Sequence, residues 1–343
     1  MSSQKTMDSR GSRRSAKPRK RRGAVLFKRF MVLLLLVLVG IAGYLYYLFD
    51  KSKDALTMAT ADAEPGIVVP AEESVKVKPV GIMLFGMDTR KETGSLNTDV
   101  MMVAVMNPTT KSAAVVTIPR DTRIELDGYK SRKANSYYAK FRAIAIDDGL
   151  SVKDAEKKAK RQVREMLGKY FGIDIAYTAT INFQGFVDVV DALGGVEVDV
   201  DMDMHYVDNA DGTKIDLKQG HQQVNGDQAL DFVRYRKSND GTNMSSDFDR
   251  NKRQSEVIGA IADRMKSFSG VTKLGNVIEA VGNNMRMDMP SSEVQNLIET
   301  YFKMGKSDIQ FTALEGTWRS PYVYVDDESL RKAKQILQAK MAE

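Results

Sequence analysis

Residues 80–119 decide the class of fold, and they read VGIMLFGMDTRKETGSLNTDVMMVAVMNPTTKSAAVVTIP. The stretch contains three short apolar runs, at residues 80–86, 99–106 and 112–119, each bounded by turn-forming or polar residues. Runs of this length, rich in β-branched residues and closed by turn residues, are typical of strands. The stretch therefore predicts three consecutive β-strands.

Strands and helices alternate after this stretch. A serine begins residues 151–171, in which apolar residues follow at helical spacing: Ala155, Ala159, Val163, Met166, Leu167 and Tyr170. A strand over 177–182, a helix over 183–193 and a strand over 195–204 are expected next, and the C-terminal third is mostly helical, with a late strand over 309–316 and a final helix from about Asp327. We therefore expect an α/β fold, a single domain with a central mixed β-sheet sandwiched by helices.

The N-terminal region has the pattern of a membrane anchor. Residues 30–49, FMVLLLLVLVGIAGYLYYLF, contain no charge and would span about 30 Å as a helix, the thickness of a bilayer core. The basic residues before the run predict a cytoplasmic N-terminus by the positive-inside rule. A cleaved signal peptide, with ATA at 59–61 as its cleavage box, is the alternative, but the run is longer than the usual apolar region of a signal peptide.

Four segments follow from this interpretation. Residues 1–29 form a basic cytoplasmic tail, 30–49 one N-terminal transmembrane helix, 50–79 an extracytoplasmic linker, and 80–343 the extracytoplasmic domain. Residues 50–79 lack a sustained apolar period, which is typical of a stalk. The expected location is the cell membrane, with a single pass.

Charge argues against nucleic acid as a partner. The chain carries 51 Lys and Arg against 45 Asp and Glu, a formal net charge of +6. Residues 1–29 hold eleven of these basic residues and one acid, so the remainder has 40 basic and 44 acidic residues. A slightly acidic domain lacks the field of cations that non-specific nucleic-acid binding needs.

The residue inventory narrows the possible chemistry. The chain has no cysteine and only two histidines, His205 and His221, both in polar, turn-rich sequence where surface positions are expected. Neither a G-x-S-x-G elbow nor a phosphate-binding G-x-x-x-x-G-K-[ST] loop is present. The acids of VEVDVDMDM alternate with apolar residues, which indicates a half-buried strand with a solvated face rather than a metal-binding Asp-x-Asp pair. Catalysis would have to use carboxylates, arginines and a hard metal ion.

Polar residues gather at the ends of the predicted strands. Asp88 and Arg90 follow the first strand, Asp99 opens the second, and Arg120 and Asp121 follow the third. If the first two strands are antiparallel, the carboxylates of Asp88 and Asp99 converge, and such a pair suits Mg²⁺. Proline at 119 ends the third strand and directs the arginine to the rim of the sheet, where α/β folds usually bind ligands.

A second concentration of charge lies in residues 232–254, FVRYRKSNDGTNMSSDFDRNKRQ. On a neutral-to-acidic body this basic stretch suits a small polyanion. If FVRYR is extended, Arg234 and Arg236 point to the same face and can hold adjacent phosphates. Arg250 or Arg253 could then close over the anion from the helix that follows.

Seven ordered blocks resemble the LytR–CpsA–Psr proteins, membrane-anchored enzymes of Gram-positive cell-envelope assembly. The blocks are FGMDTR, NTDVMMVAVMNP, VVTIPRDTRI, KANSYY, INFQGFVDVVDALGGVEVDV, LKQGHQQVNGDQALDFVRYR and DFDRNKRQ. Two features depart from the family pattern. Asn97 stands where members often have Arg, and the glycine pair usual after the KANSYY block is missing. The rim of the acceptor groove is therefore expected to differ.

The resemblance implies a reaction and a set of site residues. Family members are phosphotransferases that move an anionic glycopolymer, such as teichoic acid or capsule, from a polyprenyl-pyrophosphate carrier to the 6-hydroxyl of N-acetylmuramic acid in peptidoglycan. The resemblance assigns Mg²⁺ to Asp88 and Asp99, and it implies an apolar tunnel for the lipid. The implied pyrophosphate-binding residues are Arg120, Arg234, Arg236 and Arg250, and Arg90, Asp121, Asp247, Arg253 and Gln254 also fall within the motif blocks.

Two other functions fit the same sequence features. One is a membrane-anchored regulator that binds a wall polymer without transferring it, and the other is a hydrolase of lipid pyrophosphates. The base that takes the proton of the sugar hydroxyl is expected to be an aspartate near the metal. The identity of the glycopolymer does not follow from the residues.

Overall fold

The computed structural model describes residues 54–87, 98–209, 212–267, 277, 279–280, 282 and 284–343, and for Asp99 it describes the backbone alone. The described residues all lie within one compact unit, Asp50–Glu343. The predicted tail and the predicted transmembrane run, residues 1–49, lie outside the described residues. Among the helices that are described, none combines the length and the apolar character needed to cross a bilayer.

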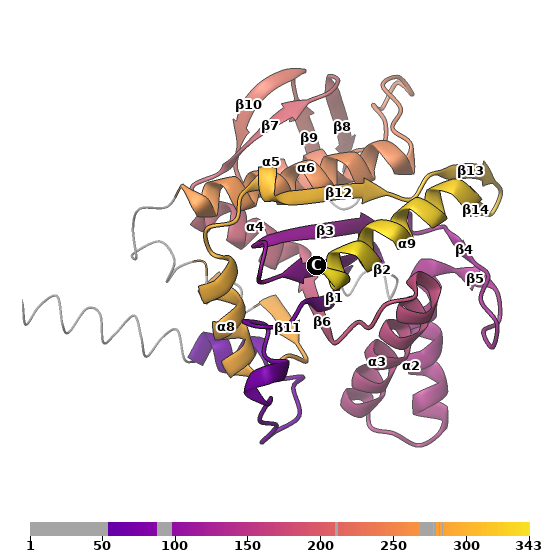
Figure 1. Ribbon diagram of the computed structural model, residues 1–343. Helices are drawn as coiled ribbons and strands as arrows, with labels where there is room; N and C mark the ends of the chain where they lie inside the picture. The colour runs from indigo at the N-terminus through magenta and orange to yellow at the C-terminus, as the bar shows by residue number, and fades with distance from the viewer. Residues whose placement is uncertain are drawn as a thin grey trace, which may run out of the picture. The chain divides into compact units, whose positions relative to one another are not determined.

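A six-stranded mixed sheet forms the centre of the domain (Figure 1), in the order β11-β6-β1-β2-β3-β12. Its strands are β1 (Val80–Met87), β2 (Thr98–Asn107), β3 (Ser112–Thr117), β6 (Tyr177–Asn182), β11 (Met285–Met287) and β12 (Ile309–Ala313). β2 is antiparallel to both β1 and β3, while β6 runs parallel to β1 and β12 parallel to β3. The predicted mixed sheet is confirmed, and the ends of β1, β3, β6 and β12 lie at one edge.

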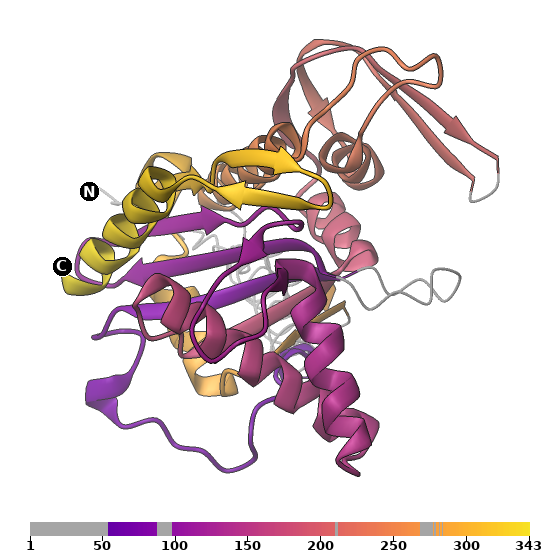
Figure 2. The same cartoon turned by 90° about the vertical axis from the view of Figure 1, so that its right-hand side faces the viewer.

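Helices cover both faces of this sheet, as expected. On one face α2 (Tyr137–Asp147), α3 (Val152–Phe171) and α9 (Asp327–Ala342) enclose the largest apolar core, which includes Phe85, Met101 and Val103. On the other face α6 (Asp247–Lys266) packs through Ile258 and α8 (Ser291–Tyr301) through Val294. Figure 2 shows the broad face of the sheet, with α9 in yellow and α2 and α3 in magenta on the viewer's side.

The helix α3 follows its sequence pattern closely. Ser151 caps it by accepting a hydrogen bond from the backbone N–H of Asp154 at 3.2 Å, and Gly172 ends it in the left-handed conformation with φ 70°. All six apolar residues that predicted this helix are buried. The final helix, α9, begins at Asp327 as predicted.

A second, smaller core lies above the sheet in Figure 1. It is built from β7 (Val196–Val200), β8 (Met204–Asp208), β9 (Thr213–Leu217), β10 (Gly220–Val224), α4 (Phe183–Ala192) and α5 (Gly226–Arg234), with α6 beneath. The alternation predicted for 195–204 is confirmed in β7, where the valines are buried and the acids between them are exposed. The predicted strand is broken after Val200, because the side chains of Asp201 and Asp203 bond to other parts of the chain. Both histidines are exposed, as expected.

Several hairpins were not predicted, among them the two formed by the shortest strands. β13 (Gly316–Arg319) pairs with β14 (Tyr322–Val325), so the strand expected over 309–316 is split between β12 and β13. The short β4 (Arg123–Ile124) and β5 (Arg132–Lys133) pair beyond the end of β3. These strands have four residues or fewer, which is too short for a periodic signal.

The described part of the expected linker is not a free stalk. A helical turn at residues 54–59 buries Ala55 and Ala59, and Val75 is 1% exposed. The Ser74 hydroxyl and the Val75 backbone N–H both donate to the buried carboxylate of Glu293 in α8, at 3.1 and 2.8 Å. Residues 54–79 therefore belong to the domain. Their small, widely spaced apolar residues gave no helical or strand period, which is why the linker prediction was wrong here.

Candidate active site

The edge where β1 ends and β2 begins holds the first predicted site residues. Met87 pairs with Thr98, whereas Gly86 pairs with Val100, so Asp99 occupies a β-bulge without a partner on β1. The antiparallel pairing assumed for the carboxylates is confirmed, and bulges are common where a strand re-aims a side chain beside an active site. Asp88, Arg90 and the side chain of Asp99 lie outside what the structure describes.

The end of β3 reaches the same edge. Thr117 pairs with Met102, and the Ile118 N–H donates to the Met101 carbonyl at 2.9 Å, so the ladder runs toward Asp99. A turn closed by the Thr122 N–H and the carbonyl of proline 119 then presents Arg120, which is half-buried. The predicted position of Arg120 at the rim of the sheet is therefore confirmed.

Asp121 is held by its neighbours. Its side chain lies 3.0 Å from the Nζ of Lys133, and its backbone carbonyl accepts the N–H of Val323 at 2.9 Å. The residue is 9% exposed. A residue whose carboxylate is held by a cation and whose backbone is held by β14 is better suited to maintaining the loop than to moving toward a substrate.

Arg234 and Arg236 do not share one extended face, which corrects the interpretation of FVRYR. Arg234 is the last residue of α5, its guanidinium 4.7 Å from the centre of the Phe183 ring, and Arg236 is exposed in the following loop. Asn225 and Gln228 form a capping box at the start of α5, and Ala229, Phe232 and Val233 are buried at helical spacing. These helix signals outweigh the alternation of the last five residues.

The helix expected after this loop is α6, and its first turns carry the remaining site residues. Ser246 and Asp249 form a capping box, and Asp247 makes an ion pair with Arg250. The hydroxyl of Ser255 lies 3.3 Å from that of Thr117, so α6 crosses the sheet at the end of β3. This contact brings the predicted residues of α6 to the same edge as Arg120.

The side-chain nitrogen of Asn251 and the side-chain oxygen of Gln254 are buried at this edge without a hydrogen-bond partner among the described residues. The hydroxyl of Thr98 also lacks a partner there, but Thr98 pairs with Met87, whose side chain packs into the core on the opposite face of the sheet. Asn251 and Gln254 stand three residues apart on α6, one turn from the Ser255–Thr117 contact. Buried polar groups nearly always have partners, so this pair indicates a place where a polar ligand supplies them.

Arg253 occupies a different environment from the one predicted. Its side chain is 2% exposed, and its Nε and Nη2 each donate to the carboxylate of Asp201 at 2.7 Å. Nη1 donates to the Ser245 hydroxyl at 2.9 Å, and the guanidinium lies 5.6 Å from the centre of the Phe232 ring. Burial alone would raise the pKa of Asp201, but the hydrogen bond and charge of Arg253 outweigh it and lower that pKa. Arg253 thus fixes the loop that carries Arg236 and the start of α6 rather than facing an open site.

The sequence reasoning missed three residues here: Asp201, Asp231 and Asn251. Asp231 lies in α5 one turn before Arg234, and burial raises its pKa to about 6, although the charge of Arg234 acts in the opposite direction. The one sequence signal for Asp231 is that an acidic residue stands among the apolar residues that α5 buries. No group of three or more His, Asp and Glu side chains within the described residues could hold a metal ion.

Comparison with known proteins identifies the family. The profile of the LytR_cpsA_psr family matches residues 44–340. The chain belongs to this family. The resemblance drawn from the seven sequence blocks is therefore confirmed.

Curated relatives in this family are named as transferases. The polyisoprenyl-teichoic acid–peptidoglycan teichoic acid transferase TagV of Bacillus subtilis (strain 168) is 29% identical over 331 residues, 91% of this chain and 78% of TagV. The enzyme named TagU in Bacillus cereus (strain AH820) is 33% identical over 278 residues, 79% of this chain and 80% of TagU.

Solved structures in the family share the fold. The crystal structure of B. subtilis TagV has a TM-score of 0.61 and 27% identity, and the match covers 77% of this chain and 98% of that one. A structure described as TagT bound to LI-WTA has a TM-score of 0.56 at 23% identity, covers 81% of this chain and 100% of that one, and supports the fold alone.

Proposed function

We propose that this protein is a membrane-anchored phosphotransferase that moves an anionic glycopolymer from a polyprenyl-pyrophosphate carrier to peptidoglycan, outside the cell membrane. The names of TagV and TagU support the reaction class. The observation that carries the proposal for this chain is the pair Asn251 and Gln254 on α6, whose buried polar groups lack partners among the described residues at the edge where Arg120 emerges. The anchor is proposed from the charge-free run at 30–49.

Binding of the pyrophosphate is assigned to arginines from three separate elements. Arg120 comes from the turn after β3, Arg236 from the loop after α5, and Arg250 from the second turn of α6. Phosphoryl transfer asks a protein mainly for positioning and charge neutralisation, and the planar guanidinium binds two phosphate oxygens at once. Arg234, stacked on Phe183, would add its charge from the end of α5.

In the proposed reaction the 6-hydroxyl oxygen of the acceptor sugar attacks the phosphorus attached to the glycopolymer. The bond from that phosphorus to the bridging oxygen breaks, and polyprenyl phosphate leaves with the bridging oxygen. The hydroxyl proton passes to a carboxylate, and a new phosphodiester joins polymer and wall. Asp121 is the less suitable base because Lys133 holds its carboxylate, so an aspartate at the β1–β2 edge is preferred.

Asp88 and Asp99 would hold Mg²⁺ in this site. The fit rests on the backbone: the bulge at Asp99 lies beside Met87, the residue before Asp88, and paired carboxylates are ligands that Mg²⁺ commonly takes together with phosphate oxygens. When bound, the ion would neutralise charge on the pyrophosphate oxygens.

The lipid chain is proposed to lie on the sheet face beneath α6. Five apolar side chains there remain only partly buried around Met102, Ala104 and Val115, namely Leu84, Val100, Ile258, Ile309 and Phe311. Incompletely covered apolar surface next to a polar edge is what an amphiphile with an anionic head requires.

The test supplies the full-length protein in detergent with a lipid-pyrophosphate glycan, Mg²⁺ and uncrosslinked peptidoglycan, and measures glycan covalently joined to the wall. Product is expected, and Arg236→Ala should lower its rate at least about tenfold by removing a charge-assisted contact with the phosphate. Lys237→Ala is the matched control, since Lys237 is the adjacent exposed cation and should tolerate the change.

Each alternative function predicts a different result. A polymer-binding regulator would retain the glycan without forming product, and a hydrolase would release glycan phosphate into solution. If Arg236→Ala and Lys237→Ala transfer glycan at equal rates, Arg236 does not bind the pyrophosphate. Undiminished transfer by Asp88→Ala or Asp99→Ala, or in excess chelator, would rule out the metal assignment.

A further inference from the structure

Exposed apolar side chains are concentrated at one end of the domain. Among the described residues eight large hydrophobic side chains are exposed, and six of them come from residues 54–79 or from α2 and α3: Met58, Ile67, Val68, Val77, Ile144 and Val152. Val68 is 87% exposed and Val152, the first residue of α3, is 56% exposed. Figures 1 and 2 both show the N-terminal segment and the turn between α2 and α3 at the lower end of the domain, away from β7–β10.

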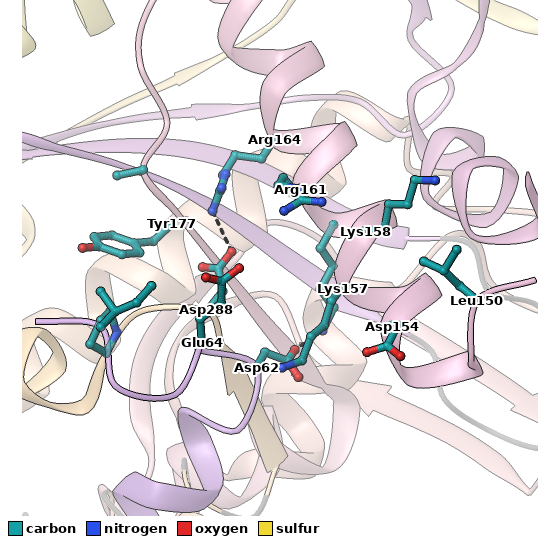
Figure 3. Close-up of a pocket in the computed structure, with 14 residues that line it drawn as sticks. Asp62, Glu64, Leu150, Asp154, Lys157, Lys158, Arg161, Arg164, Tyr177 and Asp288 are labelled. Atoms are coloured by element: carbon teal, nitrogen blue, oxygen red, sulfur yellow. Dashed lines mark hydrogen bonds and ion pairs between the residues drawn. The ribbon is translucent and has the colours of Figure 1, made fainter. Parts of the chain in front are cut away.

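A cavity opens between the same two elements. It has a volume of about 560 Å³ and is lined by five cations of α3 together with Ile67, Leu150, Tyr177 and Pro290 (Figure 3). None of the predicted site residues lines it. The cavity is therefore distinct from the candidate active site.

Three of the five cations that line this cavity pair with carboxylates, and with four acids in the lining the cavity carries one net positive charge. Lys160 pairs with Asp62 at 2.6 Å and Arg164 with Asp288 at 2.7 Å, and Lys158 pairs with Asp148 at 3.3 Å. Lys157 and Arg161, one turn apart on α3, line the cavity and make no hydrogen bond or ion pair with any residue in the described part of the chain. The acids that also line it are Asp62, Glu64, Asp154 and Asp288.

Chain length brings this end of the domain close to the proposed anchor. The charge-free run ends at Phe49 and the described domain begins at Asp54, so the first domain residue lies at most about 18 Å along the chain from the end of the run. Asp62 and Ile67, which line the cavity, follow within the same segment. If residues 30–49 span the bilayer, the part of the domain nearest the membrane includes this segment.

We infer that the surface formed by residues 54–79 and the α2–α3 turn, here called the basal surface, contacts the phospholipid surface of the membrane that holds the anchor. Ile67, Val68 and Val152 would enter the interfacial layer, where apolar side chains gain by leaving water. Lys157 and Arg161 would bind headgroup phosphates at the mouth of the cavity. This inference rests on the anchor proposed above, and it assigns an orientation to the domain that anchoring alone does not.

The test uses single-cysteine labels in the full chain, which contains no natural cysteine. Val68→Cys carries an environment-sensitive fluorophore, and Met244→Cys is the matched control, because Met244 is 71% exposed but lies in the loop between α5 and α6. Both proteins are reconstituted in phosphatidylcholine–phosphatidylglycerol vesicles containing a headgroup spin-labelled lipid. Quenching at position 68 should exceed that at 244 by at least about threefold, because only the basal surface lies within the headgroup layer.

A second pair of variants tests the cations. Lys157→Gln combined with Arg161→Gln should reduce quenching at position 68, whereas Lys332→Gln, an exposed cation on α9, should not change it. Transfer activity in detergent should be unchanged by all of these substitutions, since none lies in the candidate active site.

Other outcomes distinguish a failure of the proposed anchor from a failure of the membrane contact. If the full chain does not float with vesicles, the anchor fails and the basal contact fails with it. Equal quenching at 68 and 244 in a protein that floats and retains transfer overturns the basal contact alone. A label at 68 that responds to soluble poly(glycerol phosphate) but not to the spin-labelled lipid would make the cavity a polymer site and overturn the membrane contact.

Discussion

The ion pair between Asp201 and Arg253 gives the sharpest test of how the site is held together. Asp201→Asn removes the charge that balances a guanidinium whose side chain is 2% exposed, while it keeps the shape of the residue. Breaking a fully buried pair by removing one partner costs about 3–5 kcal/mol. The Asp201 side chain is 38% exposed, so water compensates in part, and we expect a loss of about 2–3 kcal/mol in the free energy of unfolding.

Thermal unfolding would measure this effect. For a domain of this size the loss corresponds to a fall in Tm of about 4–10 °C. Asp199→Asn is the matched control, since Asp199 lies on the same strand end, is 76% exposed and pairs with the exposed His221. An exposed ion pair contributes about 0–1 kcal/mol, so the control should change Tm by no more than about 3 °C.

The same variants test whether the pair positions the arginines proposed to bind the pyrophosphate. Arg253 bonds to Ser245 in the loop that carries Arg236, and it stands three residues after Arg250 on α6. Asp201→Asn should therefore lower the transfer rate at a temperature where the protein is fully folded, and the double variant Asp201→Asn with Arg253→Met should recover stability but not activity. If Asp201→Asn has the same Tm and the same transfer rate as Asp199→Asn, the ion pair neither stabilises the domain nor positions the arginines.

Two further predictions concern single residues with distinct signals. Trp318 is the only tryptophan of the chain, and the Nζ of Lys133, which pairs with Asp121, lies 5.8 Å from the centre of its ring. Binding of a lipid pyrophosphate beside Arg120 should therefore change tryptophan fluorescence, and a signal unchanged at saturating ligand would place the ligand elsewhere. Burial raises the pKa of Asp231 to about 6, so this carboxyl binds a proton more tightly in the folded protein than in the unfolded chain. Its contribution to the free energy of unfolding therefore falls as pH rises from about 4 to 6 and stays constant above pH 6. Asp231→Asn should raise Tm at pH 8 but much less at pH 4.5, and an equal effect at both would contradict the shifted pKa.

The sequence by itself determined the elements with strong periodicity. The valine- and methionine-rich runs over 80–119 became β1, β2 and β3, and the serine-capped pattern of 151–171 became α3, because apolar spacing and caps act through neighbours a few residues away. Ordered motif blocks were also sufficient to predict the family. The antiparallel pairing that brings Asp99 beside the end of β1 was only a condition of the metal-site hypothesis, and the structure supplies it.

Only the tertiary structure decided which polar residues meet. Arg253 resembled its neighbours in DFDRNKRQ, yet it is enclosed by Asp201, more than fifty residues earlier, and no local pattern encodes that pairing. Likewise FVRYR alternates like a strand, but the capping box at Asn225 and the burial of Phe232 against the second core make its first half the end of a helix. Residues 54–79 lacked any period, and they join the domain through the buried carboxylate of Glu293, a partner about 220 residues away. The spacing of apolar side chains along the sequence indicates which face of a helix or strand is buried. The partner of a buried charged group can come from any part of the chain that folds next to it, so local sequence does not indicate it.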